Sequence, residues 1–148
     1  MKSLINKITT TTRGLDTLPI RVGVGVIFTA HGAQKLFGWF GGYGLEGTAG
    51  WMASIGIEPG LAMAAMAGSA EFFGGLLLIA GLLVRPAALL LAVTMMVAIA
   101  KVHLANGLFM SNNGYGFGLA LLVVSISLVF RGAGSLSADR LLQNQLAN

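Results

Sequence analysis

Four long apolar segments occupy most of this sequence, at about residues 18–40, 60–84, 86–105 and 115–131. A helix that crosses a bilayer needs roughly 20 mostly apolar residues, so each segment is a candidate span. Only 9% of the residues are charged and the mean hydropathy is +0.82, whereas a soluble domain has about 25% charged residues to wet its surface. The sequence therefore predicts an all-α, polytopic membrane protein.

The second and third segments are separated by almost no loop. Pro86 follows Arg85 directly, and a proline fits the first turn of a helix because an N–H there has no partner within the helix. These two helices must then be antiparallel neighbours, and we expect one domain, residues 1–148, folded as a four-helix bundle. Small residues at spacings that favour close packing of membrane helices recur in the spans: Ala70 with Gly74, Gly114 with Gly118, and Gly23 with Gly25.

The basic residues predict the orientation of the bundle, because lysine and arginine favour cytoplasmic loops. The loops at about 41–59 and 106–114 contain no basic residue and carry Glu46 and Glu58. All basic residues except Lys35 and Lys101 lie at the opposite end of the bundle, before or at the start of the first span, in the tight turn, or in the tail: Lys2, Lys7, Arg13, Arg21, Arg85, Arg131 and Arg140. Both termini are therefore expected in the cytoplasm.

Composition also excludes several classes of function. The chain has no cysteine, which rules out disulfides, thiolate metal sites and thiol redox chemistry on the protein itself. The net charge of +4 comes from scattered basic residues without interleaved aromatic residues, so nucleic acid is not an expected partner. No metal site is predicted, and the methionines are interpreted as core filling.

Six polar residues interrupt the apolar spans in the half of the bundle predicted to face outward. At 1.5 Å per residue, the polar positions in the first and third spans lie about 20 to 26 Å above the start of their helices, and Glu71 lies about 16 Å below the outer end of the second. Glu71 is the only acid within a span. An ionisable residue at the centre of a membrane helix costs about 2.5 to 3.5 kcal/mol, so Glu71 is expected to be paired, protonated or functional. The predicted ligand-binding chamber contains His31, Gln34, Lys35, Glu71 and, because they point about 200° apart on an ideal helix, one of Lys101 and His103.

Each of these residues also has a structural interpretation. Lys35 and Lys101 are near enough to the interface for their ammonium groups to reach water. His103 can be interpreted as a solvated histidine at the membrane interface, and His31 as a histidine that forms a hydrogen bond between packed helices. Glu71 would be satisfied by a purely structural ion pair with either lysine.

Several motifs occur in an order that resembles the DoxX family of small bacterial membrane proteins, over about residues 18–142. They read RVGVGVIFTAHGAQKLFG, GTAGWMASIGI, AEFFGGLLLIAGLLVRPAALLLAVTMM and RGAGSLSADRLL. The positions that carry the family pattern are Gly32 and Lys35, then Glu71, Gly74 and Gly75, then Arg85, and finally Gly132, Gly134, Ser137 and Asp139. An acid that relatives often have at the entry to the fourth helix is missing from Gly114-Tyr115-Gly116-Phe117. The resemblance implies a multi-pass protein of the bacterial inner membrane and, since the family takes its name from a membrane partner of a thiosulfate:quinone oxidoreductase, an accessory redox role.

Three functional hypotheses use the same residues. In the first, the chain is an accessory subunit of a quinone-linked redox system, with electrons supplied by a partner protein. In the second, it is a non-catalytic carrier or binding protein for a small solute or lipid, which with only four helices would form a homo-oligomer. The third, a bis-histidine haem protein, is disfavoured because His31 and His103 differ in height by about 6 Å. A purely structural assembly role is a further alternative.

Overall fold

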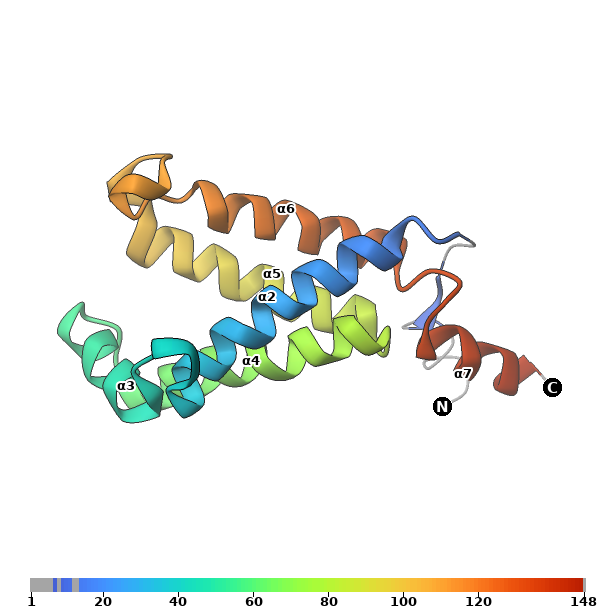
Figure 1. Cartoon of the computed structure of the whole chain (residues 1–148), viewed down its shortest axis with the longest axis horizontal. Helices are drawn as coiled ribbons and strands as arrows, with labels where there is room; N and C mark the ends of the chain where they lie inside the picture. Colours follow the sequence, from blue (N-terminus) through green and yellow to red (C-terminus); the bar gives the residue numbers. More distant parts are fainter. Residues whose placement is uncertain (1–6, 8, 12–13, 148) are drawn as a thin grey trace.

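The computed structural model describes residues 7, 9–11 and 14–147, and this part of the chain is built from helices (Figure 1). The longest are α2 (Thr17–Phe37), α4 (Gly60–Ala80), α5 (Val84–Ala98) and α6 (Gly116–Arg131). A π-helical segment, η2 (Ile99–His103), and a 3-10 turn, η3 (Leu104–Asn106), extend α5. The shorter elements are η1 (Trp39–Gly41), α3 (Gly44–Ser54), η4 (Met110–Asn112) and α7 (Ala138–Ala147).

Backbone geometry sets the ends of the long helices. Gly38 and Gly81 stop α2 and α4 in the left-handed conformation, with φ of 72° and 68°, which glycine adopts without steric cost. Pro86 lies in the first turn of α5, and the turn before that helix is only three residues long. The short connection predicted between the second and third segments is therefore present.

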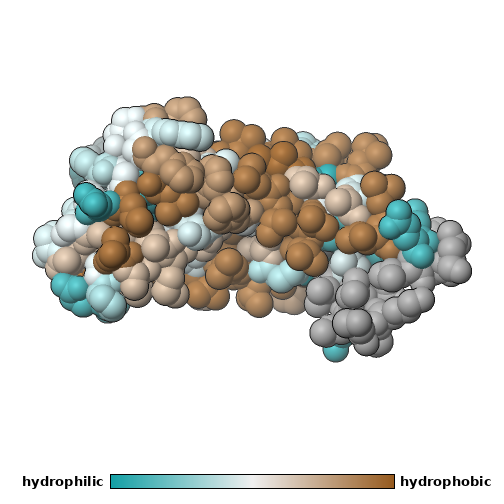
Figure 2. Space-filling view, turned by 90° about the horizontal axis from the view of Figure 1, so that it is seen from below, coloured by the Kyte–Doolittle hydropathy of each residue, from teal (hydrophilic) through white to brown (hydrophobic). Residues whose placement is uncertain are grey.

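Two of these helices, Gly60–Ala80 and Val84–Asn106, are long and apolar enough to cross a membrane, and α6 is a shorter apolar helix. Only 39% of the most apolar window of the first helix and 28% of that of the second are buried within the structure, unlike the core helix of a soluble protein. In Figure 2, hydrophobic side chains cover the middle of the visible face and hydrophilic ones gather toward its ends. The all-α membrane class is thus supported, while the four-span count and the orientation stay predictions.

Glycines bring α2 and α4 into backbone contact. A Cβ atom added at Gly32 would lie 2.3 Å from the backbone nitrogen of Phe72, and one added at Gly25 would lie 2.8 Å from the carbonyl oxygen of Gly75. Both distances are far below van der Waals contact, so a side chain at either position would force the helices apart. This crossing controls which residues of α2 and α4 face each other.

The main hydrophobic core joins all four long helices, and its buried members include Phe28, Leu78, Leu91 and Leu128. A second, smaller core lies between α3 and α4 around Ala49, Met52 and Ala64. In Figure 1 the start of α2 and helix α7 lie at one end of the molecule, here called the termini end, and α3 and η4 lie at the other, the loop end. The α5–α6 pair diverges from α3 and the adjacent ends of α2 and α4 toward the loop end.

Two buried charged residues close the turn between α4 and α5. Arg21, only 2% exposed, donates hydrogen bonds to the carbonyl oxygens of Leu78 (2.9 Å) and Ile79 (2.7 Å) in the last turn of α4. Asp139, 1% exposed, accepts hydrogen bonds from the backbone N–H groups of Leu83 (2.7 Å) and Val84 (3.1 Å) at the start of α5. Helix ends leave such groups without partners within the helix, and here distant side chains satisfy them.

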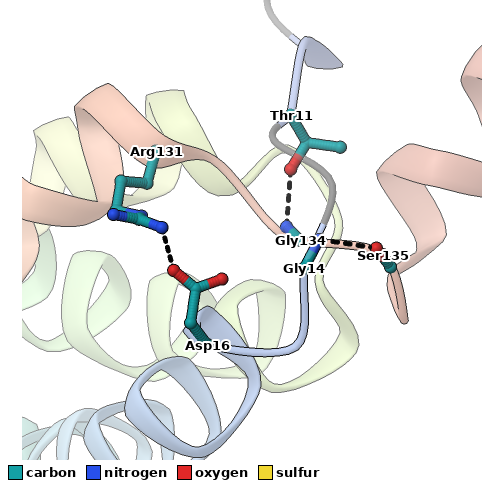
Figure 3. A network of polar contacts seen from close by, with 6 residues as sticks. All are labelled: Thr11, Gly14, Asp16, Arg131, Gly134 and Ser135. Carbon is teal, nitrogen blue, oxygen red and sulfur yellow. Dashed lines mark hydrogen bonds and ion pairs between the residues drawn. The ribbon is translucent and has the colours of Figure 1, made fainter.

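The segments flanking the bundle are also tied to each other at the termini end (Figure 3). The N–H of Gly134 donates to the hydroxyl of Thr11, and the N–H of Gly14 donates to the hydroxyl of Ser135 at 2.8 Å. Arg131, the last residue of α6, forms an ion pair with Asp16 just before α2. The chain before α2 and the chain after α6 therefore form one layer across this end.

Candidate functional site

An ion pair between Lys35 and Glu71 connects the loop-end half of α2 to the middle of α4. The lysine Nζ lies 2.5 Å from Oε2 of Glu71. The glutamate side chain is only 4% exposed and the lysine side chain is 26% exposed. The structure therefore provides the single acid of the predicted spans with a charged partner.

The helix crossing explains why these two side chains meet. A Cβ atom at Gly68, one turn before Glu71, would lie 3.2 Å from the Cβ of Lys35, so a larger residue there would press on the lysine. The hydroxyl of Thr48 in α3 donates to the carbonyl oxygen of Lys35 at 3.4 Å. Lys35 also lies in the last turn of α2, where the partial negative charge of the helix end favours a cation.

His31 lies one turn before Lys35 on the same face of α2, and its ring is exposed. The ring lies near Phe117 at the start of α6, with the ring centroids 6.1 Å apart. Gln34 and Lys35 come three and four residues after His31, which places the three side chains on one face of α2. Gln34 also donates from Nε2 to the carbonyl oxygen of Phe40 at 3.2 Å. The structure thus gathers His31, Gln34, Lys35 and Glu71 within one stretch of the α2–α4 contact.

The other two candidates lie in the π-helical segment η2. Lys101 is exposed, and among the described residues no hydrogen bond or ion pair joins it to the Lys35–Glu71 pair. The Nδ1 atom of His103 lies 2.9 Å from the carbonyl oxygen of Asn113, which also accepts a hydrogen bond from Asn106. Because a carbonyl oxygen can only accept, Nδ1 carries the proton and Nε2 keeps its lone pair when the ring is neutral. His103 therefore tethers the loop before α6.

Arg21 and Asp139 are buried charged residues that sequence reasoning did not single out as interacting. Arg21 entered only as a sign of membrane orientation, and Asp139 only as part of a family pattern. Their partners are mostly backbone groups more than 50 residues away, so neither helical periodicity nor local spacing indicates them. Their contacts are structural and lie at the opposite end of the molecule from Lys35 and Glu71.

The chemistry available at the Lys35–Glu71 site is hydrogen bonding to a polar group and movement of a proton. Lysine can donate to a carbonyl or anionic oxygen, the carboxylate can accept a proton, and the imidazole can do either. Among the described residues, no group of three or more His, Cys, Asp or Glu side chains could hold a metal ion. The site is that of a membrane-associated helical protein with a charged pair buried between two helices.

The chain belongs to the DoxX family, whose model matches residues 17–104. It is also similar to "Putative oxidoreductase CatD" of Bacillus subtilis (strain 168), with 36% identity over 125 residues that cover 84% of this chain and 85% of the relative. No solved structure matches this chain. The resemblance inferred from the sequence motifs is therefore confirmed.

Proposed function

We propose that this protein is an accessory subunit of a quinone-linked redox system in the bacterial inner membrane. In this proposal α2, α4, α5 with its extension, and α6 all cross the bilayer, with both termini in the cytoplasm. The family and the named relative support the redox part of the proposal. The basic residues support the orientation, because Arg131 ends α6 at the termini end beside Asp16 and Arg140 belongs to α7, whereas the loops of the other end have none.

The observation that carries the proposed site is the Lys35–Glu71 pair. A carboxylate that is 4% exposed in a membrane helix is costly to keep, and pairing offsets that cost only in part. The pair lies beside the exposed ring of His31, on the side of α2 that faces α6. A small polar molecule that enters from the loop end could therefore meet an ammonium group, an imidazole and a carboxylate together.

The roles of the residues follow from their chemistry. Lys35 and His31 would donate hydrogen bonds to a quinone carbonyl oxygen, which gains negative charge when the ring is reduced. Glu71 would accept or return the proton that accompanies that change of charge. Because the chain has no cysteine for thiol redox chemistry, we propose that a partner protein exchanges the electrons.

The first test is an absorption spectrum and mass spectrometry of the small molecules that accompany the protein when it is extracted gently from its native membrane. A quinone at near one per chain is expected. It should be lost in Glu71→Gln and Lys35→Ala and kept in the matched controls Glu46→Gln and Lys7→Ala, whose side chains are exposed. All four variants should elute from size exclusion like the wild type, which separates loss of ligand from loss of fold.

Two results would count against the proposal. Equal quinone content in the wild type and in both site variants would remove the pair from binding. A colourless protein that carries a polar solute and no quinone would favour a binding or transport function instead.

A further inference from the structure

A shallow apolar groove follows the α2–α4 contact on the side away from α5 and α6. It has a volume of about 200 Å³, and its floor and walls include Val26, Ala30, Ala33, Phe72 and Ile79. At 100° per residue, Ala33 and Lys35 lie on opposite sides of the α2 face that meets α4. The groove and the proposed redox site are therefore separate, back to back across one helix contact.

The lining of this groove has two polar side chains, Thr29 and, at its loop end, Trp39 with its indole N–H. The hydroxyl of Thr29 already donates to the carbonyl oxygen of Gly25 at 2.8 Å. Away from Trp39, a polar or charged occupant would thus lose its hydration without finding a side-chain partner. The volume is also smaller than the 300 to 1,000 Å³ or so of typical small-molecule sites, which favours a single narrow hydrocarbon chain over a substituted ring.

Aromatic residues close the loop end of the groove. Trp39 and Phe40 line it and are 55% and 72% exposed. Phe40 has φ of 54°, a costly conformation for a bulky residue, and its carbonyl oxygen is held by Gln34. The ring of Phe37 contacts Trp39 and the groove residue Phe72, with centroids 5.1 and 5.2 Å apart. Aromatic side chains of this kind favour the boundary between hydrocarbon and headgroups.

The length of the groove matches one leaflet of a membrane. From Val26 to the end of α2 at Phe37 the helix rises about 16 Å, and half of a bilayer's hydrocarbon core is about 15 Å thick. We propose that the groove binds one acyl chain of a phospholipid from the leaflet at the loop end, with the headgroup beside Trp39 and Phe40. The small residues Ala30 and Ala33 leave the space that the chain fills.

The test fills the groove with a side chain. Ala30 is half-buried in the groove, whereas Ala120 is exposed on α6, so Ala30→Phe and Ala120→Phe add the same ring inside and outside the proposed site. Native mass spectrometry of gently extracted protein should find one phospholipid fewer on Ala30→Phe than on the wild type or Ala120→Phe. Equal numbers of retained phospholipids in all three would overturn the proposal, as would a polyisoprenoid quinone that is lost only from Ala30→Phe.

A second measurement uses the fact that the chain has only two tryptophans. In Trp51→Phe, the remaining Trp39 should be quenched by phospholipids with brominated acyl chains, and the further change Ala30→Phe should reduce that quenching. Quenching of Trp39 that is unchanged by Ala30→Phe would refute the bound chain even if the fold is intact. Glu71→Gln should leave the phospholipid count unchanged, so this inference and the proposed quinone site can fail separately.

Discussion

Removing either partner of the Lys35–Glu71 pair should have unequal effects on stability, because the two side chains are not equally buried. In Lys35→Met, the carboxyl group of Glu71 stays at 4% exposure and has lost its cation. Breaking a buried pair in this way costs about 3 to 5 kcal/mol. In Glu71→Gln, the lysine is already 26% exposed near the end of α2 and can extend its ammonium group toward water, so we expect a loss of only about 1 kcal/mol.

The double variant Lys35→Met/Glu71→Gln measures the interaction energy between the two side chains. It leaves no buried charge, so its stability should be close to that of Glu71→Gln alone. The interaction energy between the two sites would then equal the loss in Lys35→Met alone, about 3 to 5 kcal/mol, which is at or above the upper end of the range found for residues in contact. The exposed controls Lys7→Met and Glu46→Gln should change the free energy of unfolding by less than about 0.5 kcal/mol.

The assay is reversible unfolding in mixed micelles, by adding sodium dodecyl sulfate and following helix content by circular dichroism. Tryptophan fluorescence serves as a second probe, because the chain has no cysteine for thiol-reactive dyes. Equal losses in the two single variants would refute the argument from burial. A double variant destabilised by the sum of the two single losses would show that Lys35 and Glu71 do not interact.

Three further predictions concern the helix contacts and the termini end. Gly32→Ala should lower the thermal unfolding temperature strongly, because its Cβ would lie 2.3 Å from the α4 backbone. Gly23→Ala has open space around the new Cβ and should gain up to about 1 kcal/mol of helix stability. Similar melting curves for the two variants would contradict the contact between Gly32 and α4. Arg21→Lys keeps the charge but not the fork of donors, and should cost about 2 kcal/mol of unfolding free energy in the same micelle titration; an unchanged titration midpoint would show that the carbonyl contacts contribute little. Burial raises the pKa of the Asp139 carboxyl above its ordinary value of 3.8, against the opposing effects of the Val84 and Leu83 N–H groups and two arginines. The folded state then binds more protons than the unfolded state between pH 3.8 and the native pKa, so the contribution of Asp139 to stability should fall as pH rises through that window and level off above it. Asp139→Asn should remove this part of the pH dependence, and a wild-type slope in that variant would contradict the assignment.

The long helices could be predicted from the sequence because long apolar runs and their glycine and proline boundaries are local signals. The contacts of the small residues could not be predicted, because sequence spacing shows where small residues recur but not which helix packs against them. Of the glycines singled out in advance, Gly25 does meet α4, but Gly74 faces a side chain of α5 and Gly118 faces Ile99 in η2. Nothing lies within 4 Å of a Cβ at Gly23. The contact of Gly32 with α4 depends on the crossing of two helices that are distant in sequence.

The candidate site was likewise predictable only in part from the sequence. Glu71 was expected to need a partner because it is the only acid in a span, and Lys35 was one of two lysines that could supply it. The relation between Lys101 and His103 was judged from 100° of rotation per residue, but both residues lie in a π-helical segment. A π-helix has a different number of residues per turn, so rotation predicted for an α-helix does not apply there. Apolar patterning alone does not reveal such a segment.

The side chains that close the α4–α5 turn have a consequence for how this protein is made. Arg21 is near the beginning of the chain and Asp139 is near its end, and the backbone contacts of Arg21 with Ala133 and Leu136 span 112 and 115 positions in a chain of 148. The α4–α5 hairpin therefore cannot acquire its final capping until Asp139 has left the ribosome. A nascent chain stalled after α6 would have its long helices but would lack the Asp139 hydrogen bonds that cap the start of α5. The termini end would therefore be the part of the molecule that folds last.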